Sequence, residues 1–337
     1  MQMMAWAEQQ AIVGVIYGGI QRAGQELGVP FDALMEWIGY AQQIENQNRI
    51  LNEKCVEVVN EYQEAGYGCM VLKGQGNAVM YPSPLLRMSG DIDIWSLSPD
   101  PPSPKRVGRL RNDIIQYVKN KHADSETRYY HVEYTDVDVP VEAHFMPGVM
   151  NNPVYNRRLQ QWYEEKADSG WLMAELPEGA GRIPVPTWEF NVVFQLAHMM
   201  HHFFDEGIGL RQFVDYYYLL RQEQNIKIEK LKSLSCTLKY LGLMEFAGAV
   251  MFIEKEVLGL DEKYLIVEPD EKRGRTLLRE IMEGGNFGRS GHLDQHSAAK
   301  KYFQKTWRNL RLAKEYPAEA LCEPLFRTWH FFWRLTH

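Results

Sequence analysis

The stretch "RMSGDIDIW" (87–95) decides how the chain is interpreted, because it predicts a strand that holds two acids one residue apart. Side chains alternate between the faces of a strand, so Asp91 and Asp93 share one face while Ile92 and Ile94 point to the core. Two like charges this close repel each other and raise each other's pKa unless a cation lies between them. Hard oxygen ligands with few His or Cys nearby favour Mg²⁺ or Mn²⁺.

The alternative is a solvated edge strand that carries two acids by chance. The preceding segment "VLKGQGN" (71–77) favours a functional pair, because it predicts a strand that ends in a glycine turn and opens a helix. Backbone N–H groups in such a turn bind phosphate, and Lys73 beside Gly74 adds positive charge. A glycine turn of this kind is also common without any ligand.

Two further segments bear on the same site. In "VPVEAHF" (139–145), Glu142 and His144 share a face of a predicted strand that can lie beside the aspartate strand. Glu142 can then act as a third metal ligand or as a base, whereas a hairpin with one polar face is the plain alternative. Arg87, just before the aspartates, is expected to meet a phosphate or to neutralise the acids, or to be a surface arginine.

The combination of strand, glycine turn, short helix, D-h-D strand and later acidic strand resembles the nucleotidyltransferase fold of the polymerase-beta superfamily. The segments "LKG…YPSPLLRMSGDIDIW", "VEAHF" and "LAHMMHHFFDEGIGLRQFVDYYYLL" are similar to an uncharacterised nucleotidyltransferase family found in many bacteria. The resemblance covers about residues 50 to 260. The turn "LKGQGN" departs from the superfamily, since it lacks the usual serine and is followed by a longer insertion.

The resemblance implies transfer of an NMP group from an NTP such as ATP to the hydroxyl of an acceptor by in-line attack with two Mg²⁺ (or Mn²⁺) ions. It assigns the metal to Asp91, Asp93 and Glu142, and the phosphates to Lys73 and Gly74. The acceptor stays open between a small molecule, an RNA and a protein. The alternative function is a catalytically degenerate nucleotide-binding protein that serves as a sensor or partner.

A helical block downstream carries further candidates. His198 and His202 are four residues apart and share one face of a helix, and Arg211 and Asp215 do the same on the next helix. These four residues, with His144, are expected to contact nucleotide or acceptor at the cleft. The alternatives are a packed His-rich helix with an Arg–Asp ion pair, and a metal-phosphohydrolase centre whose usual spacing the sequence does not match.

Local patterns predict an α+β protein with N-terminal helices and a C-terminal helical domain. The resemblance implies that the part between them is a small mixed-sheet nucleotidyltransferase core. The 337 residues fit two or three domains. We expect an N-terminal helical segment at 1–65, the core at 66–186 and the helical domain at 187–337. Frequent Pro and Gly leave the structure of 147–186 unassigned.

Composition narrows the classes of partner. The net charge of -7 and a pI near 5.9 disfavour nonspecific binding to nucleic acid, although the basic helix predicted at 105–122 keeps an RNA acceptor open. The four cysteines match no zinc or disulfide pattern and predict core thiols in a reducing compartment. No run of 18 apolar residues occurs, so we expect a cytoplasmic protein without a membrane span.

Overall fold

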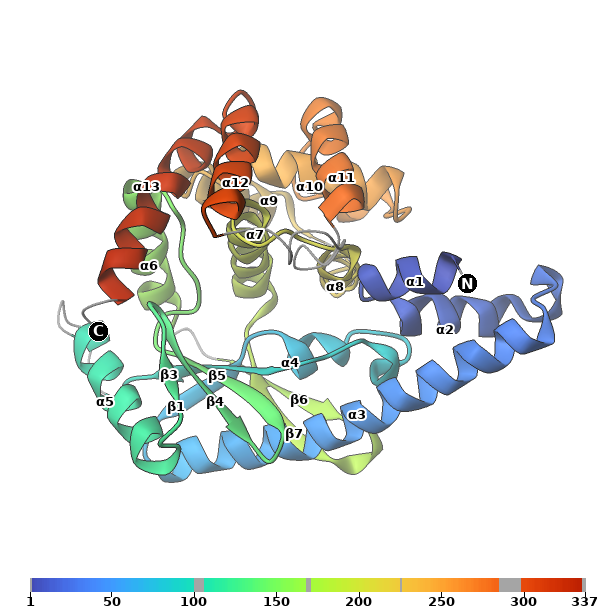
Figure 1. The fold of residues 1–337 in the computed structure, drawn as a ribbon, viewed down its shortest axis with the longest axis horizontal. Coiled ribbons are helices and arrows are strands. Elements are labelled where there is room, and N and C mark those ends of the chain that lie inside the picture. The colour runs from blue at the N-terminus through green and yellow to red at the C-terminus, as the bar shows by residue number, and fades with distance from the viewer. Residues whose placement is uncertain (1, 100–105, 168–170, 225, 285–297, 335–337) are drawn as a thin grey trace. The chain divides into compact units, whose positions relative to one another are not determined.

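The chain divides into two compact units, and each is described by itself. Unit 1 comprises residues 1–147 and 166–187, and unit 2 comprises 148–165 and 188–337. Figure 1 draws both as ribbons. A computed structural model describes residues 2–99, 106–167, 171–224, 226–284 and 298–334.

Unit 1 is built on a five-stranded mixed sheet with the order β1-β2-β5-β4-β3. Only the pair formed by β2 and β5 is parallel, and the other neighbours are antiparallel. The small mixed sheet with helices before and after it confirms the predicted α+β class. The strands are β1 (Gly68–Val71), β2 (Ile92–Leu97), β3 (Glu126–Thr127), β4 (His131–Asp136) and β5 (Val139–His144).

The turn between β4 and β5 confirms the hairpin predicted from "TDVD". Val137 and Asp138 both have positive φ, 47° and 65°, as a two-residue turn that matches the strand twist requires. Asp138 tolerates this conformation, whereas a β-branched valine does so only at a cost. The turn fixes the register in which Glu133 lies opposite Glu142.

One face of the sheet is apolar and is covered by two helices, α3 (Phe31–Glu64) and α5 (Arg106–Lys121). Ile92 and Ile94 of β2 belong to a buried cluster with α3 side chains such as Val58 and α5 side chains such as Ile114. This confirms the alternation predicted for the aspartate strand, because the isoleucines face the core. The opposite face of the sheet carries the acids and histidines.

The remaining elements of unit 1 lie before the sheet, in its connections and after it. The helix α3 ends as predicted next to Gly66, whose φ of +88° stops a helix. Residues 147–186, unassigned from sequence, contain a helix and the antiparallel hairpin β6–β7. Besides those already given, the elements are α1 (Gln2–Gln9), α2 (Val13–Ala23), η1 (Gly24–Leu27), α4 (Gly74–Ala78), η2 (Pro84–Leu86), β6 (Leu172–Leu176), η3 (Pro177–Gly179) and β7 (Gly181–Val185).

Unit 2 is helical, as predicted for the C-terminal part. Its centre is α10, which packs against α7, α8, α9 and α11 and is buried along most of its length. The elements are α6 (Pro153–Ala167), α7 (Trp188–Phe204), α8 (Leu210–Leu220), α9 (Ile228–Tyr240), α10 (Met244–Glu256), η4 (Glu262–Tyr264), α11 (Glu271–Gly284), α12 (Ala298–Leu312) and α13 (Pro317–Arg334).

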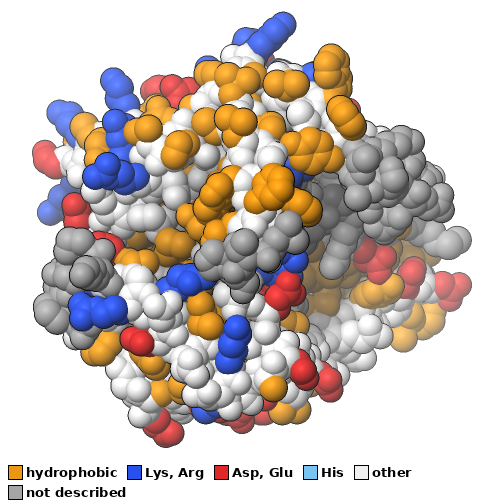
Figure 2. Space-filling model, turned by 60° about the vertical axis from the view of Figure 1, so that its left-hand side comes forward, with side chains coloured by type: hydrophobic (Ala, Val, Ile, Leu, Met, Phe, Trp, Pro, Cys, Tyr) orange, Lys and Arg blue, Asp and Glu red, His pale blue; other side chains and the backbone are white. Residues whose placement is uncertain are grey.

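The surface of the protein corrects one expectation from the sequence. All four cysteines are free, but Cys236 is exposed, so the expectation of core thiols is wrong there because α9 turns that position to solvent. Within the described ranges, no helix has the length and hydropathy that a bilayer-spanning segment needs. Figure 2 shows hydrophobic side chains gathered on the face it displays, and α12 and α13 expose several large ones. Lys105 of the predicted basic helix and most of the proline-rich loop before it lie outside the described residues.

Candidate active site

Three carboxylates converge on the polar face of the sheet. Asp91 immediately precedes β2 and Asp93 lies within it, so strand alternation turns both side chains to the same face. Because β5 runs parallel beside β2, Glu142 lies directly opposite Asp93. One oxygen from each carboxylate lies within 4.8 Å of the others. The structure therefore brings together the three acids that the sequence singled out.

The acids continue as a row across four neighbouring strands. Glu126 of β3 pairs with Glu133 of β4, Glu133 pairs with Glu142 of β5, and Glu142 pairs with Asp93 of β2. Like charges directly opposite one another destabilise a sheet, so such a row requires compensating cations. Glu126 and Glu133 were not predicted from the sequence.

Two basic side chains, Lys73 and His144, hold the buried end of the row. The Nζ of Lys73 lies 2.7 Å from Oδ1 of Asp93, and Nε2 of His144 lies 3.0 Å from the same oxygen. The same His144 nitrogen lies 3.1 Å from Oε2 of Glu142, so one imidazole bridges two of the three acids. Asp93 is 1% exposed, whereas Asp91 and Glu142 are partly open to solvent. Lys73 and His144 thus fix Asp93 and leave the other two carboxylates accessible.

The outer end of the row has its own partners. Arg128 donates from Nε and Nη2 to Oε2 of Glu133, at 3.0 and 2.9 Å, and its Nη1 lies 2.9 Å from Glu126. Nε2 of His131 lies 3.0 Å from the other oxygen of Glu133. His131 in turn pairs with His144 across the hairpin. Lysine, histidine and arginine side chains therefore lie among the acids along the polar face.

These contacts set the charge states of the site. Burial alone would raise the pKa of Glu142, but the hydrogen bond from His144 and the nearby charges lower it to about 2. Burial would lower the pKa of Lys73, but the charges of Asp93, Glu142 and Asp91 outweigh burial and raise it. The pKa of His144 is raised in the same way, because its two carboxylate partners outweigh its burial. At neutral pH, Glu142 is therefore an ionised carboxylate and Lys73 is charged.

The turn after β1 brings a second backbone segment against the aspartates. The N–H of Leu72 donates to the carbonyl of Asp93 at 3.0 Å. Gly74, which begins α4, has φ of +48°, and a Cβ there would lie 3.1 Å from the carbonyl oxygen of Asp91. Glycine is needed here for both reasons, since L residues avoid positive φ and the approach is tight. The turn thus sets the position of the Asp91 backbone.

We expect Gly74→Ala to lower the free energy of unfolding by about 1–2 kcal/mol, through the cost of positive φ and the contact with Asp91. The measurement is urea denaturation of both proteins. Gly90→Ala is the matched control, because Gly90 has no positive φ and a Cβ there meets nothing within 4 Å. Equal stability changes for the two variants would show that the turn imposes no such constraint.

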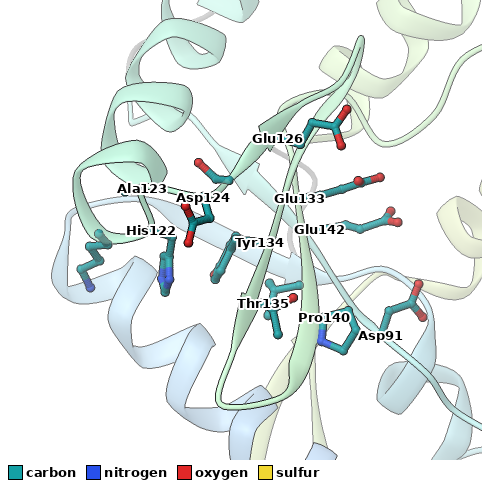
Figure 3. A pocket seen from close by; sticks show the side chains of 13 residues that line it. Asp91, His122, Ala123, Asp124, Glu126, Glu133, Tyr134, Thr135, Pro140 and Glu142 are labelled. Atoms are coloured by element: carbon teal, nitrogen blue, oxygen red, sulfur yellow. The ribbon is translucent and has the colours of Figure 1, made fainter.

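A pocket of about 610 Å³ opens beside the acids. Asp91 and Glu142 lie in its wall, together with Glu133, Glu126 and residues of the segment 121–125 that joins α5 to β3. Figure 3 shows the carboxylates of Asp91, Glu126, Glu133 and Glu142 pointing to the same side of the hairpin. The pocket belongs wholly to unit 1.

Arg87 lies away from this pocket wall. Its side chain is buried, with only 4% exposed, and Nη1 donates to Oγ of Ser89 at 2.8 Å. Its backbone carbonyl accepts a hydrogen bond of 2.7 Å from Nδ2 of Asn48 on α3. These contacts hold Arg87 against the loop before Asp91, and its expected contact with a phosphate stays a prediction.

The helical block lies on α7 and α8 of unit 2. The rings of His198 and His202 meet edge to face with centroids 4.3 Å apart, and His198 stacks on Phe194. Asp215 is buried. Among the described residues, the groups of ligand atoms close enough to share a metal do not include these side chains. Their role, with Arg211, at a cleft stays a prediction.

Comparison with known proteins shows the family of the chain. Residues 2–258 match the uncharacterised nucleotidyltransferase family, and the chain belongs to that family. No curated protein matches significantly. Among solved structures, a nucleotidyltransferase-like antigenic protein from Paracoccidioides brasiliensis is similar at 10% identity and a TM-score of 0.38, covering 70% of this chain and 98% of its own.

Proposed function

We propose that this nucleotidyltransferase moves an NMP group from an NTP such as ATP to a hydroxyl of its acceptor, with Mg²⁺ or Mn²⁺ at Asp91, Asp93 and Glu142. The observation that carries the proposal is the convergence of these three carboxylates, whose oxygens lie within 4.8 Å of one another on adjacent strands. Membership of a nucleotidyltransferase family supports the type of reaction.

The residues present fit a divalent cation. All three donors are carboxylate oxygens, the ligand type that Mg²⁺ and Mn²⁺ prefer, and Glu142 is ionised at neutral pH. Asp91 and Glu142 are partly exposed, so an ion and a triphosphate can reach them. When bound, the cation supplies charge stabilisation to the phosphate oxygens and the departing pyrophosphate.

The reaction balances without a further reactant. The acceptor oxygen forms a bond to the α-phosphorus while the bond from that phosphorus to the bridging oxygen breaks, and pyrophosphate leaves with both electrons. Glu142 accepts a hydrogen bond from the acceptor hydroxyl and takes its proton as the new bond forms. A pKa of about 2 makes Glu142 a weak base, so the proton moves late, when the attacking oxygen has become acidic.

The neighbouring residues position and balance these groups. Lys73 holds Asp93 and adds positive charge for the triphosphate at the turn that begins with Gly74. His144 orients Asp93 and Glu142 through its bridging nitrogen. We propose that Arg87 supports phosphate binding indirectly, because it holds the loop that precedes Asp91.

Thermal unfolding with each of the four NTPs, with and without Mg²⁺, tests the proposal. A ligand that binds only the folded protein stabilises it by about 2.7 kcal/mol at a hundredfold excess over its Kd. We expect a Mg²⁺-dependent rise in Tm for at least one NTP, and its loss in the double variant Asp91→Ala plus Asp93→Ala. A rise that persists in that variant would contradict the assignment of the site.

Pyrophosphate release then separates transfer from binding alone. A transferase releases pyrophosphate when it receives its acceptor, whereas a nucleotide sensor binds the NTP and releases none. Stabilisation by NTP with no release in the presence of any acceptor tried, including RNA, would favour the degenerate sensor. The turn "LKGQGN" lacks the usual serine, and this is the feature that favours a nucleotide sensor without transfer activity.

A further inference from the structure

The wall of the pocket beside the three carboxylates carries a large excess of negative charge. Five acids against one lysine leave four negative charges among the residues of the wall. Part of this charge is compensated, because Arg128 contacts Glu126 and Glu133, while His131 and His144 contact Glu133 and Glu142. Lys121 is itself 3.0 Å from Glu61 of α3. The charged residues of the wall are Asp91, Lys121, Asp124, Glu126, Glu133 and Glu142.

The arrangement of the acids indicates a ligand of opposite charge. The carboxylates of Glu126, Glu133 and Glu142 follow one another across three strands and point to the same side. A concave wall with one sign of charge focuses the potential and concentrates counter-ions.

The size of the pocket selects a small molecule. Its volume of about 610 Å³ lies within the range of small-molecule sites, roughly 300–1,000 Å³. A phosphate-rich polymer such as RNA would meet repulsion from every acid in the wall. Asp91 and Glu142 belong both to this wall and to the proposed reaction centre, so a molecule in the pocket lies next to the reacting atoms.

We propose that this pocket binds the acceptor, and that the acceptor is a small polycation that carries a hydroxyl, an amino alcohol or an amino sugar. The inference rests on the proposed function, because it names the substrate class of that same site. The ammonium groups pair with the carboxylates of Asp124, Glu126 and Glu133. The hydroxyl lies toward Glu142, where it attacks the α-phosphorus and loses its proton as described above.

Binding of spermidine tests the pocket without requiring transfer, because spermidine has three amines and no hydroxyl. The measurement is isothermal titration calorimetry on the full chain with Mg²⁺ present, at low and at physiological ionic strength. We expect one site whose affinity falls with added salt. Fully N-acetylated spermidine, which has nearly the same skeleton without charge, is expected not to bind.

A pair of charge-removing variants locates the binding. Asp124→Asn plus Glu126→Gln is expected to raise the Kd for spermidine about 10- to 25-fold, since each such charge at contact distance contributes roughly a factor of five. Glu53→Gln plus Glu64→Gln removes two exposed acids of α3 that lie outside the pocket and should leave the Kd unchanged. An equal change in both pairs, or no binding to the wild-type protein, overturns the inference.

Transfer itself is tested with 1,3-diamino-2-propanol, the smallest acceptor that places amines on both sides of a hydroxyl. We expect it to increase pyrophosphate release from the NTP, whereas glycerol at the same concentration does not. NTP binding at Asp91 and Asp93 without any spermidine binding would leave the proposed function intact. It would contradict the proposal that the acceptor is a polycation. Spermidine binding without NTP binding would instead contradict the proposed transferase activity. The pocket would then bind a polycation, but that polycation would not be an acceptor.

Discussion

Asp91→Asn is expected to lower NMP transfer by at least about 1,000-fold while the protein stays as stable as the wild type to within about 1 kcal/mol. The carboxylate of Asp91 is partly exposed, and one of its oxygens lies within 4.8 Å of those of Asp93 and Glu142. Its loss removes a ligand that we propose for the divalent cation, while Lys73 keeps its contact with Asp93. Activity and stability should therefore separate at this position.

Asp93→Asn is expected to differ, because Asp93 has a structural task as well. Its Oδ1 is held by Lys73 and His144, and the side chain is 1% exposed. Removing the charge leaves Lys73 and the buried His144 without the carboxylate that both contact, a change that costs about 3 kcal/mol. We therefore expect loss of transfer together with a clear fall in the free energy of unfolding.

Two readouts check this contrast independently of the acceptor. Electron paramagnetic resonance of Mn²⁺ titrated into the protein gives the Kd of the metal site. We expect each variant to raise this Kd more than about 100-fold, which exceeds the typical effect of mutating a residue that only hydrogen-bonds to a metal ligand. Urea denaturation gives the stability. Asp138→Asn is the matched control, because it makes the same change at an exposed turn position of the same sheet. Unchanged Mn²⁺ binding in Asp91→Asn would contradict the metal assignment.

The sequence predicted the central pair because the period of a strand is a local property. Alternation alone places Asp91 and Asp93 on one face and Ile92 with Ile94 on the other. That Glu142 lies beside Asp93 depends on the parallel pairing of β2 and β5, which no local pattern contains. The family resemblance supplied that neighbour, and the register of the sheet agrees with it.

Glu133 and His131 were missed although the sequence held a signal for them. The segment "HVE" in β4 mirrors "EAH" in β5 around the predicted turn "TDVD". Counting back from a two-residue turn places Glu133 opposite Glu142 and His131 opposite His144, which is the observed register. The register of the predicted hairpin could therefore have shown which acids lie opposite each other, in addition to which face each acid occupies.

The helix α6 was missed for a different reason. Frequent Pro and Gly in 147–186 concealed a strong start signal, since Asn152 caps the helix and Pro153 occupies its first position. Proline is favoured there because its missing N–H would have no partner within the helix. Composition averaged over a long segment thus hid a signal that two adjacent residues carried.

The pH dependence of stability should change most at Glu319, a buried acid of α13. Its carboxylate oxygens accept hydrogen bonds from the backbone N–H groups of Asn151, at 2.8 Å, and Asn152, at 3.1 Å. Burial raises its pKa to about 7 in spite of those bonds. The folded protein therefore keeps a proton on Glu319 between about pH 4.5 and 7, where the unfolded chain has released it.

The sign follows from this difference in proton binding. Where the folded state binds more protons than the unfolded state, stability falls as the pH rises, so the contribution is fully present below about pH 4.5 and lost as the pH passes 7. A shift of this size corresponds to a loss on the order of 3 kcal/mol. Other titrating groups contribute as well, so a comparison with a non-titrating variant is needed.

Glu319→Gln supplies that comparison, since glutamine has nearly the same shape, accepts hydrogen bonds and does not titrate. We expect the stability difference between variant and wild type to shift by about 3 kcal/mol in favour of the variant between pH 5 and pH 8, in urea denaturation. Glu229→Gln, an exposed position at the start of α9, should leave the two curves parallel. Parallel curves for Glu319→Gln would mean that the two backbone N–H groups keep this carboxylate ionised, and that burial does not control its proton.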